Sequence, residues 1–146
     1  MKRDDENGID ERSFRFYRDV LTFVDPIERG PKTDGLVKQL VDSAGSIGNN
    51  REEALGGSSH KEFIRYNEFA LRAANESVRW LRACAARRLG SPAKCIALLD
   101  EGRQMARILA QIVITAKRNT YTYTYTFDLT FALCLLTFDL QCATCP

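Results

Sequence analysis

Five basic residues recur at helical spacing between positions 61 and 82, and they are the side chains best placed to bind a ligand. Projected on an ideal helix at about 100° per residue, four of them lie within about 40° of one direction, and the fifth lies about 60° to one side. The stripe would be about 27 Å long at a rise of about 1.5 Å per residue. Its members are Lys61, Arg65, Arg72, Arg79 and Arg82. Such a stripe predicts contacts with phosphates and salt-dependent binding.

The same stripe can also be interpreted as a solvated helix face. Glu68 interrupts it and Glu76 lies beside it. Intrahelical pairs such as Arg72–Glu76 and Arg65–Glu68 would then neutralise part of its charge. A ring of subunits would instead repeat the stripe around an axis and turn a modest charge per chain into a basic surface. The sequence leaves both interpretations open.

Two aromatic residues share this helix with the basic stripe. Tyr66 and Trp80 could stack on nucleic-acid bases. Their spacing relative to Ala70 and Ala73 is more typical of core positions.

Residues suited to catalysis or metal binding are sparse. His60 is the only histidine, and no Ser or Cys nucleophile pairs with it in the pattern. Cys142 and Cys145 form one C-x-x-C without a second pair or a nearby histidine, which is weak evidence for a metal site. Neither Glu53 nor Glu76 has the histidine three residues later that di-iron bundles require. We therefore predict a protein that is not an enzyme, with no catalytic residue, no cofactor and no metal.

The segment 43–50, SAGSIGNN, places two glycines and two asparagines inside a helical pattern. An interior glycine costs about 1 kcal/mol relative to alanine, so Gly48 predicts close approach of another helix or a kink. Asn50 projects toward the core or its edge, where its amide needs partners. We predict that Asn50, Glu53 and Glu76 form a polar network that sets helix register or subunit packing. The alternative is a ligand or ion site lined by the same residues.

Four amphipathic segments with start and stop signals position these residues. Their connections are short, which favours an all-α, antiparallel up-down-up-down four-helix bundle over residues 13–118. Pro26 disfavours the helical backbone conformation at Asp25 and so ends the first segment. A Ser-x-x-Glu capping box begins the third segment, and Ser-Pro begins the fourth. The expected boundaries are Ser13 to Asp25-Pro26, Thr33 or Asp34 to Gly56-Gly57, Ser59 to about Arg88, and Ser91-Pro92 onward.

The two ends of the chain differ from this middle part. Residues 1–12 are expected to be a polar, solvated leader. Residues 119–146 contain TYTYTYTF, which alternates with the period of a strand, and the words LTF and TFDL each occur twice. We predict that residues 119–146 form an irregular, low-complexity tail outside the bundle.

Length and composition are those of an ordinary soluble domain. The chain has 146 residues, 45% of them hydrophobic and 27% charged, with a net charge of +2. No apolar run approaches the roughly 18 residues of a membrane helix, and the N-terminal segment has no secretory signal pattern. Five cysteines without a disulfide framework fit a reducing compartment. We expect a cytoplasmic protein with no membrane partner.

Specific short motifs between residues 8 and 119 resemble those of the bacterial four-helix bundle proteins called the 23S rRNA intervening-sequence protein family. The resemblance implies a four-helix bundle that assembles into a homo-oligomeric ring, a pentamer. Relatives of this family include accessory proteins of diversity-generating retroelements, and most members have no established activity. The tail after Asn119 departs from the family pattern. The matching motifs are Gly8-Ile9-Asp10-Glu11-Arg12-Ser13-Phe14, Ser43-Ala44-Gly45-Ser46-Ile47-Gly48-Asn49-Asn50, Ser59-His60-Lys61-Glu62-Phe63, Arg79-Trp80-Leu81 and Ala116-Lys117-Arg118-Asn119.

Taken together, these features predict a non-enzymatic, oligomeric accessory or scaffold protein. Its basic stripe would bind RNA or DNA through phosphates without sequence preference. The alternative is a protein–protein interaction module with no nucleic-acid role, using apolar flanks such as Ile108 and Ile112.

Overall fold

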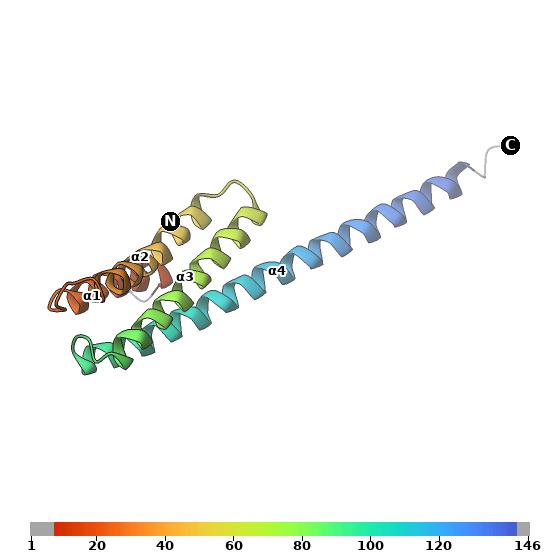
Figure 1. Cartoon of the computed structure of the whole chain (residues 1–146). Coiled ribbons are helices and arrows are strands. Elements are labelled where there is room, and N and C mark those ends of the chain that lie inside the picture. The colour runs from red at the N-terminus through yellow and green to blue at the C-terminus, as the bar shows by residue number, and fades with distance from the viewer. Residues whose placement is uncertain (1–7, 143–146) are drawn as a thin grey trace. The chain divides into compact units, whose positions relative to one another are not determined.

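The structure is a computed structural model that describes the backbone of residues 8–142 and the side chains of residues 8–119. The chain divides into two compact units, Met1–Val113 and Ile114–Pro146, and each is described by itself. The described residues form four helices and no strand, which confirms the all-α prediction (Figure 1). The helices are α1 (Ile9–Val24), α2 (Asp34–Gly56), α3 (His60–Ala86) and α4 (Pro92–Cys142).

The first helix begins earlier than the sequence predicted. Gly8 precedes its first turn, so Ser13 is not an N-cap but an interior residue with 2% of its surface exposed. Residues 9–12, expected in a solvated leader, are therefore helical. The reason is tertiary, because Asp10 and Arg12 form ion pairs with residues of α2 and α4.

Local capping chemistry sets the start of α3 as predicted. The Ser59 hydroxyl accepts a hydrogen bond from the Glu62 backbone N–H at 3.2 Å. The Glu62 carboxylate accepts one from the Ser58 N–H at 2.9 Å, one residue earlier than in the usual capping box. Hydrogen bonds from Ser58 lower the pKa of Glu62.

The connection between α3 and α4 depends on left-handed backbone. The third helix ends at Ala86, and Arg88 and Gly90 then have φ values of 56° and 68°. A Cβ at Gly90 would lie 2.6 Å from the Phe23 ring, so glycine is required there by both conformation and space. The fourth helix then begins at Pro92, as predicted.

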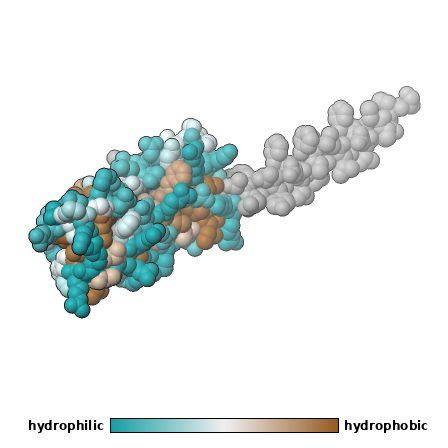
Figure 2. Space-filling model, in the orientation of Figure 1, coloured by the Kyte–Doolittle hydropathy of each residue, from teal (hydrophilic) through white to brown (hydrophobic). Residues whose placement is uncertain are grey.

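The core of the first unit draws large side chains from all four helices. As residue numbers rise along α2 they fall along α3, because Ser43 and Arg51 bond to Ser77 and Asn67. This ordering confirms antiparallel packing. Figure 2 shows one side of the bundle, on which hydrophilic residues predominate. Fully buried large side chains include Phe16, Val20, Phe23, Val37, Leu40, Ile47, Leu81, Met105 and Leu109.

The glycines of the SAGSIGNN segment lie against α1. A Cβ at Gly45 would lie 3.3 Å from the Tyr17 ring, and one at Gly48 would lie 3.3 Å from the Ser13 hydroxyl oxygen. Of the two explanations offered for Gly48, these contacts support close helix approach rather than a kink, and α1 is the helix that approaches.

Cys84 and Cys95 are buried core residues. Burial raises the pKa of the Cys84 thiol to about 11 and also raises that of Cys95. Both thiols are therefore protonated at neutral pH and act as small apolar groups.

The part of residues 119–146 whose backbone is described is helical rather than irregular, and its alternating pattern does not form a strand there. The helix α4 continues through the TYTYTYTF segment to Cys142. Extending an existing helix needs no new nucleus, whereas a strand needs a partner strand to bond with. Cys145 and the rest of the predicted C-x-x-C after Cys142 lie outside the described residues.

Candidate nucleic-acid interface

The basic stripe lies on the exposed face of α3. All five of its side chains are exposed: Lys61, Arg65, Arg72, Arg79 and Arg82. The opposite face of α3 carries the buried residues Ala70, Ala74 and Leu81. The amphipathic pattern therefore orients the stripe away from the core, as the sequence predicted.

Three arginines of this stripe lie over aromatic rings of the same helix. The guanidinium carbons of Arg65 and Arg72 are 5.4 and 5.5 Å from the centroid of Phe69, and that of Arg79 is 5.7 Å from Trp80. Attraction between a cation and a ring face limits the freedom of these long side chains. The arrangement thus holds several guanidinium groups in place on one surface.

Phe69 was missed as a site residue by sequence reasoning. A signal was present, because Phe69 follows Arg65 by four positions and precedes Arg72 by three. Residues at both spacings are neighbours on a helix surface. Tyr66 and Trp80 are both half-buried, and Trp80 packs against the core, as its spacing favoured. The Trp80 indole donates a hydrogen bond to Glu76 at 3.3 Å.

Two basic residues of α4 lie across a groove from α3. Arg103 and Arg107 are exposed, and they line a shallow groove between α3 and α4 with a volume of about 400 Å³. Across the groove, α3 contributes Leu71, Asn75 and Val78. Sequence reasoning did not connect the two helices, because their alignment depends on how α3 and α4 pack.

The structure does not join Asn50, Glu53 and Glu76 in one intrachain network. The Asn50 side chain donates to the carbonyl of Ser46 in its own helix at 2.7 Å. Glu53 is exposed on α2, and Glu76 is exposed on α3. A role for these residues between subunits stays a prediction.

The buried polar network of the bundle lies elsewhere. Arg51 has a side chain only 7% exposed, and its guanidinium donates to Asp10 at 2.7 and 3.3 Å and to the Asn67 side chain. Asn67 is fully buried and donates to the Phe63 carbonyl at 2.7 Å. This cluster joins α1, α2 and α3. Sequence reasoning missed it because arginine is almost never buried unless paired, although Arg51 follows Ile47 at core spacing.

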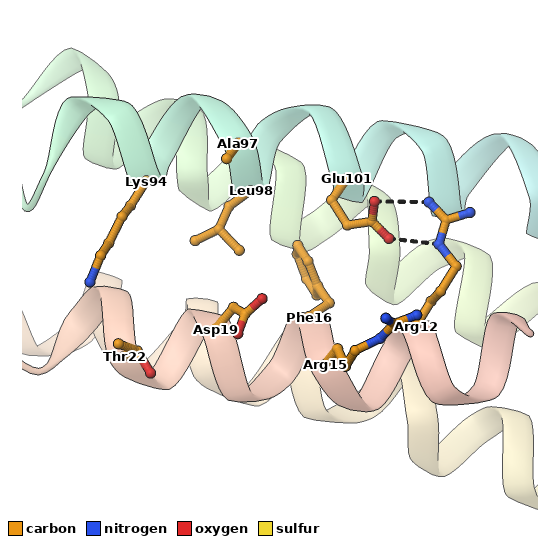
Figure 3. A pocket seen from close by; sticks show the side chains of 9 residues that line it. All are labelled: Arg12, Arg15, Phe16, Asp19, Thr22, Lys94, Ala97, Leu98 and Glu101. Carbon is orange, nitrogen blue, oxygen red and sulfur yellow. Dashed lines mark hydrogen bonds and ion pairs between the residues drawn. The ribbon is translucent and has the colours of Figure 1, made fainter. Parts of the chain in front are cut away.

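A second concave region lies between α1 and α4 (Figure 3). Its volume is about 650 Å³, its floor includes Phe16 and Leu98, and its rim carries both basic and acidic groups. Arg12 is held there by Glu101 through two bonds of 2.8 Å and by Gln104 at 3.0 Å. These bonds raise the pKa of Arg12. Its charge is therefore largely satisfied within the fold, which makes this region a weaker phosphate site than the α3 face.

The part of the chain that the structure describes contains no group of three or more side chains able to hold a metal ion. None of its described helices is long and apolar enough to cross a membrane. In the same part of the chain, His60 is exposed and its ring stacks on that of Phe63.

Comparison with known proteins agrees with the fold. The sequence model of the family described as 23S rRNA-intervening sequence protein matches residues 6–111. A crystal structure of a protein of unknown function from the S23 ribosomal protein family of Bacteroides thetaiotaomicron is similar, with a TM-score of 0.65 and 23% identity over 73% of this chain and 98% of that one. No curated protein matches the chain. Because the family match covers most of the sequence and the four helices agree with it, this chain belongs to the 23S rRNA-intervening sequence protein family.

Proposed function

We propose that this protein is a non-enzymatic, oligomeric accessory or scaffold protein that binds nucleic-acid phosphates through the α3 basic stripe. The observation that carries the proposal is the set of exposed arginines held over rings on one helix face. Fixed guanidinium groups lose less side-chain entropy on binding than free ones do. Arg103 and Arg107 add two exposed cations beside the groove between α3 and α4.

The proposed binding is sequence-independent, because the stripe presents cations in a row. Contacts with phosphates position a protein on nucleic acid and carry no direct sequence information. Assembly of several copies into a ring, as the family resemblance implies, would repeat the stripe and strengthen binding through multivalency.

Fluorescence anisotropy of a mixed-sequence RNA and a mixed-sequence DNA tests the proposal. Five phosphate contacts predict that the affinity for a single strand falls about a hundredfold between about 50 and 200 mM salt. The double variant Arg72→Glu/Arg79→Glu should abolish binding at the lower salt while the helix content and thermal midpoint stay unchanged.

The matched control carries the same charge change on other helices. Arg18→Glu/Lys38→Glu reverses two exposed basic residues, whose side chains are 61% and 69% exposed, on α1 and α2. Both double variants take the formal net charge from +2 to −2. If the control lost as much affinity as the α3 variant, binding would depend on net charge and the proposed site would be wrong. Absence of binding by the wild-type protein at the lower salt would overturn the function itself.

A second candidate function is a protein–protein interaction module. The observation that favours it is the apolar surface of α4 within the first unit, where Ile96 is 68% exposed and Ile108 and Ile112 are half-buried. In that case the variant Arg72→Glu/Arg79→Glu captures as much partner protein in a pull-down as the wild type does. Ile108→Asp disperses the oligomer, as measured by size-exclusion chromatography with light scattering. Dispersal together with retained RNA binding would separate assembly from nucleic-acid binding.

A further inference from the structure

Three guanidinium–ring pairs on α3 offer more than positive charge. Arg65 and Arg72 approach Phe69 from positions one turn before it and one turn after it, and Arg79 lies over Trp80. The three arginines are exposed. Each of the three guanidinium carbons therefore lies within 5.7 Å of a ring centroid on an exposed side chain.

A planar cation backed by a ring is a surface on which a nucleic-acid base can stack. Unpaired bases stack on aromatic side chains and on arginine planes, and this stacking tolerates any sequence because every base has a π face. In a duplex those faces are covered by neighbouring base pairs. A platform of this kind therefore distinguishes single strands from duplexes.

The spacing of the platforms suits one strand that follows the helix. The Arg72–Phe69 pair and the Arg79–Trp80 pair are placed by arginines seven positions apart, which is about 10.5 Å along the helix axis. Arg103 and Arg107 lie beyond the α3–α4 groove and provide further cations for the sugar–phosphate backbone. The stripe arginines thus supply both phosphate contacts and stacking positions on one helix face.

We infer that the α3 face binds single-stranded nucleic acid and that its guanidinium–ring pairs stack with unpaired bases. This inference rests on the proposed function and specifies its ligand class. Single-stranded RNA and single-stranded DNA share the chemistry, so both are probes.

The test compares labelled single strands of about 20 nucleotides, RNA and DNA, with a duplex of the same sequence. The key variant is Arg72→Lys/Arg79→Lys, which keeps both charges and removes both guanidinium planes. We expect its affinity for single strands to fall about tenfold, since stacking contributes about 1–3 kcal/mol per base, while the salt dependence stays the same. Phe69→Leu, checked for folding by its thermal midpoint, should give a similar loss.

The outcomes are distinguishable. Preference for single strands together with a loss in the lysine variant supports the inference, and the ratio of RNA to DNA affinity identifies the natural strand. Equal or tighter duplex binding, or lysine variants that bind as the wild type does, overturns the inference and leaves phosphate binding standing. Failure of every probe to bind at about 50 mM salt overturns the proposed function as well.

Discussion

Two groups of arginines in the same bundle have opposite surroundings. Arg51 is buried on α2, where its guanidinium bonds to Asp10 and Asn67. Arg72 and Arg79 are exposed on α3, where their guanidiniums lie over rings. The N–H groups of Arg51 donate to partners inside the fold. The side chains of Arg72 and Arg79 are exposed to solvent. Burial rather than residue type therefore separates an arginine bonded within the fold from one whose side chain is exposed to solvent.

The loss of folding free energy on replacing an arginine also differs between the two groups. Removing the buried Arg51 guanidinium leaves the buried Asn67 side-chain oxygen without its donor, whereas Asp10 is half exposed and can be solvated, so the cost lies mainly in the Asn67 group. Exposed charged residues contribute little to folding, so the α3 arginines are free to serve a ligand. The comparison predicts that stability and binding separate cleanly between the two groups.

The largest expected effect is on stability and comes from Arg51→Met. The change removes the hydrogen bond that the fully buried Asn67 Oδ1 accepts from Arg51. It also removes the ion pair between Asp10 of α1 and Arg51 of α2. We expect the free energy of unfolding to fall by about 3 kcal/mol, measured by urea denaturation. The control Arg82→Met on the exposed face should stay within about 0.5 kcal/mol of the wild type. Equal losses in both variants would break the distinction between the two groups.

The next largest effect on stability is expected where α1 packs against α2. In Gly45→Val the added side chain meets the Tyr17 ring, which lies only 3.3 Å from an added Cβ. Overpacking should lower stability by about 2 kcal/mol. Gly35→Val makes the same change in the same helix, where no atom lies within 4 Å of the added Cβ, and it should be close to neutral. A neutral Gly45→Val would show that α1 can move away without loss.

The smallest effect concerns the cap that begins α3 and so sets the position of Lys61 and Arg65. Because the pKa of Glu62 is lowered in the folded protein, its stabilising contribution is complete above its usual value of 4.5. That contribution disappears as the pH falls through the lowered pKa. Glu62→Gln should therefore melt slightly earlier than the wild type at pH 7 and match it at the acid end. A constant difference across the pH range would exclude the carboxylate as the source.

Most helix boundaries were readable from the sequence because their causes are local. Pro26, Gly57, Ser59 and Pro92 act within one turn of the chain, and each begins or ends a helix as predicted. The start of α1 was misplaced because its cause lies in other helices, where Arg51 and Glu101 bind its first turn. The helical backbone after Asn119 was not predicted, because the period-two pattern of TYTYTYTF differs from the period of an amphipathic helix.

The candidate site was readable in part. Helical spacing identified the exposed arginines, since the side opposite a core stripe must face solvent. It did not identify Arg103 and Arg107 as neighbours of α3, because one helix carries no information about the rotation of another. The network predicted for Asn50, Glu53 and Glu76 likewise depended on how α2 and α3 are rotated relative to each other, which the sequence of one helix does not show.

The sequence by itself determined most of the helix boundaries and the exposed α3 stripe, because periodicity and caps act along one helix. Only the tertiary structure decided which polar residues are buried. Arg51 and Asn67 come together from α2 and α3, and Asp10 completes the cluster from α1. Desolvation cost depends on every neighbour in space, and those neighbours are set by the packing of all four helices.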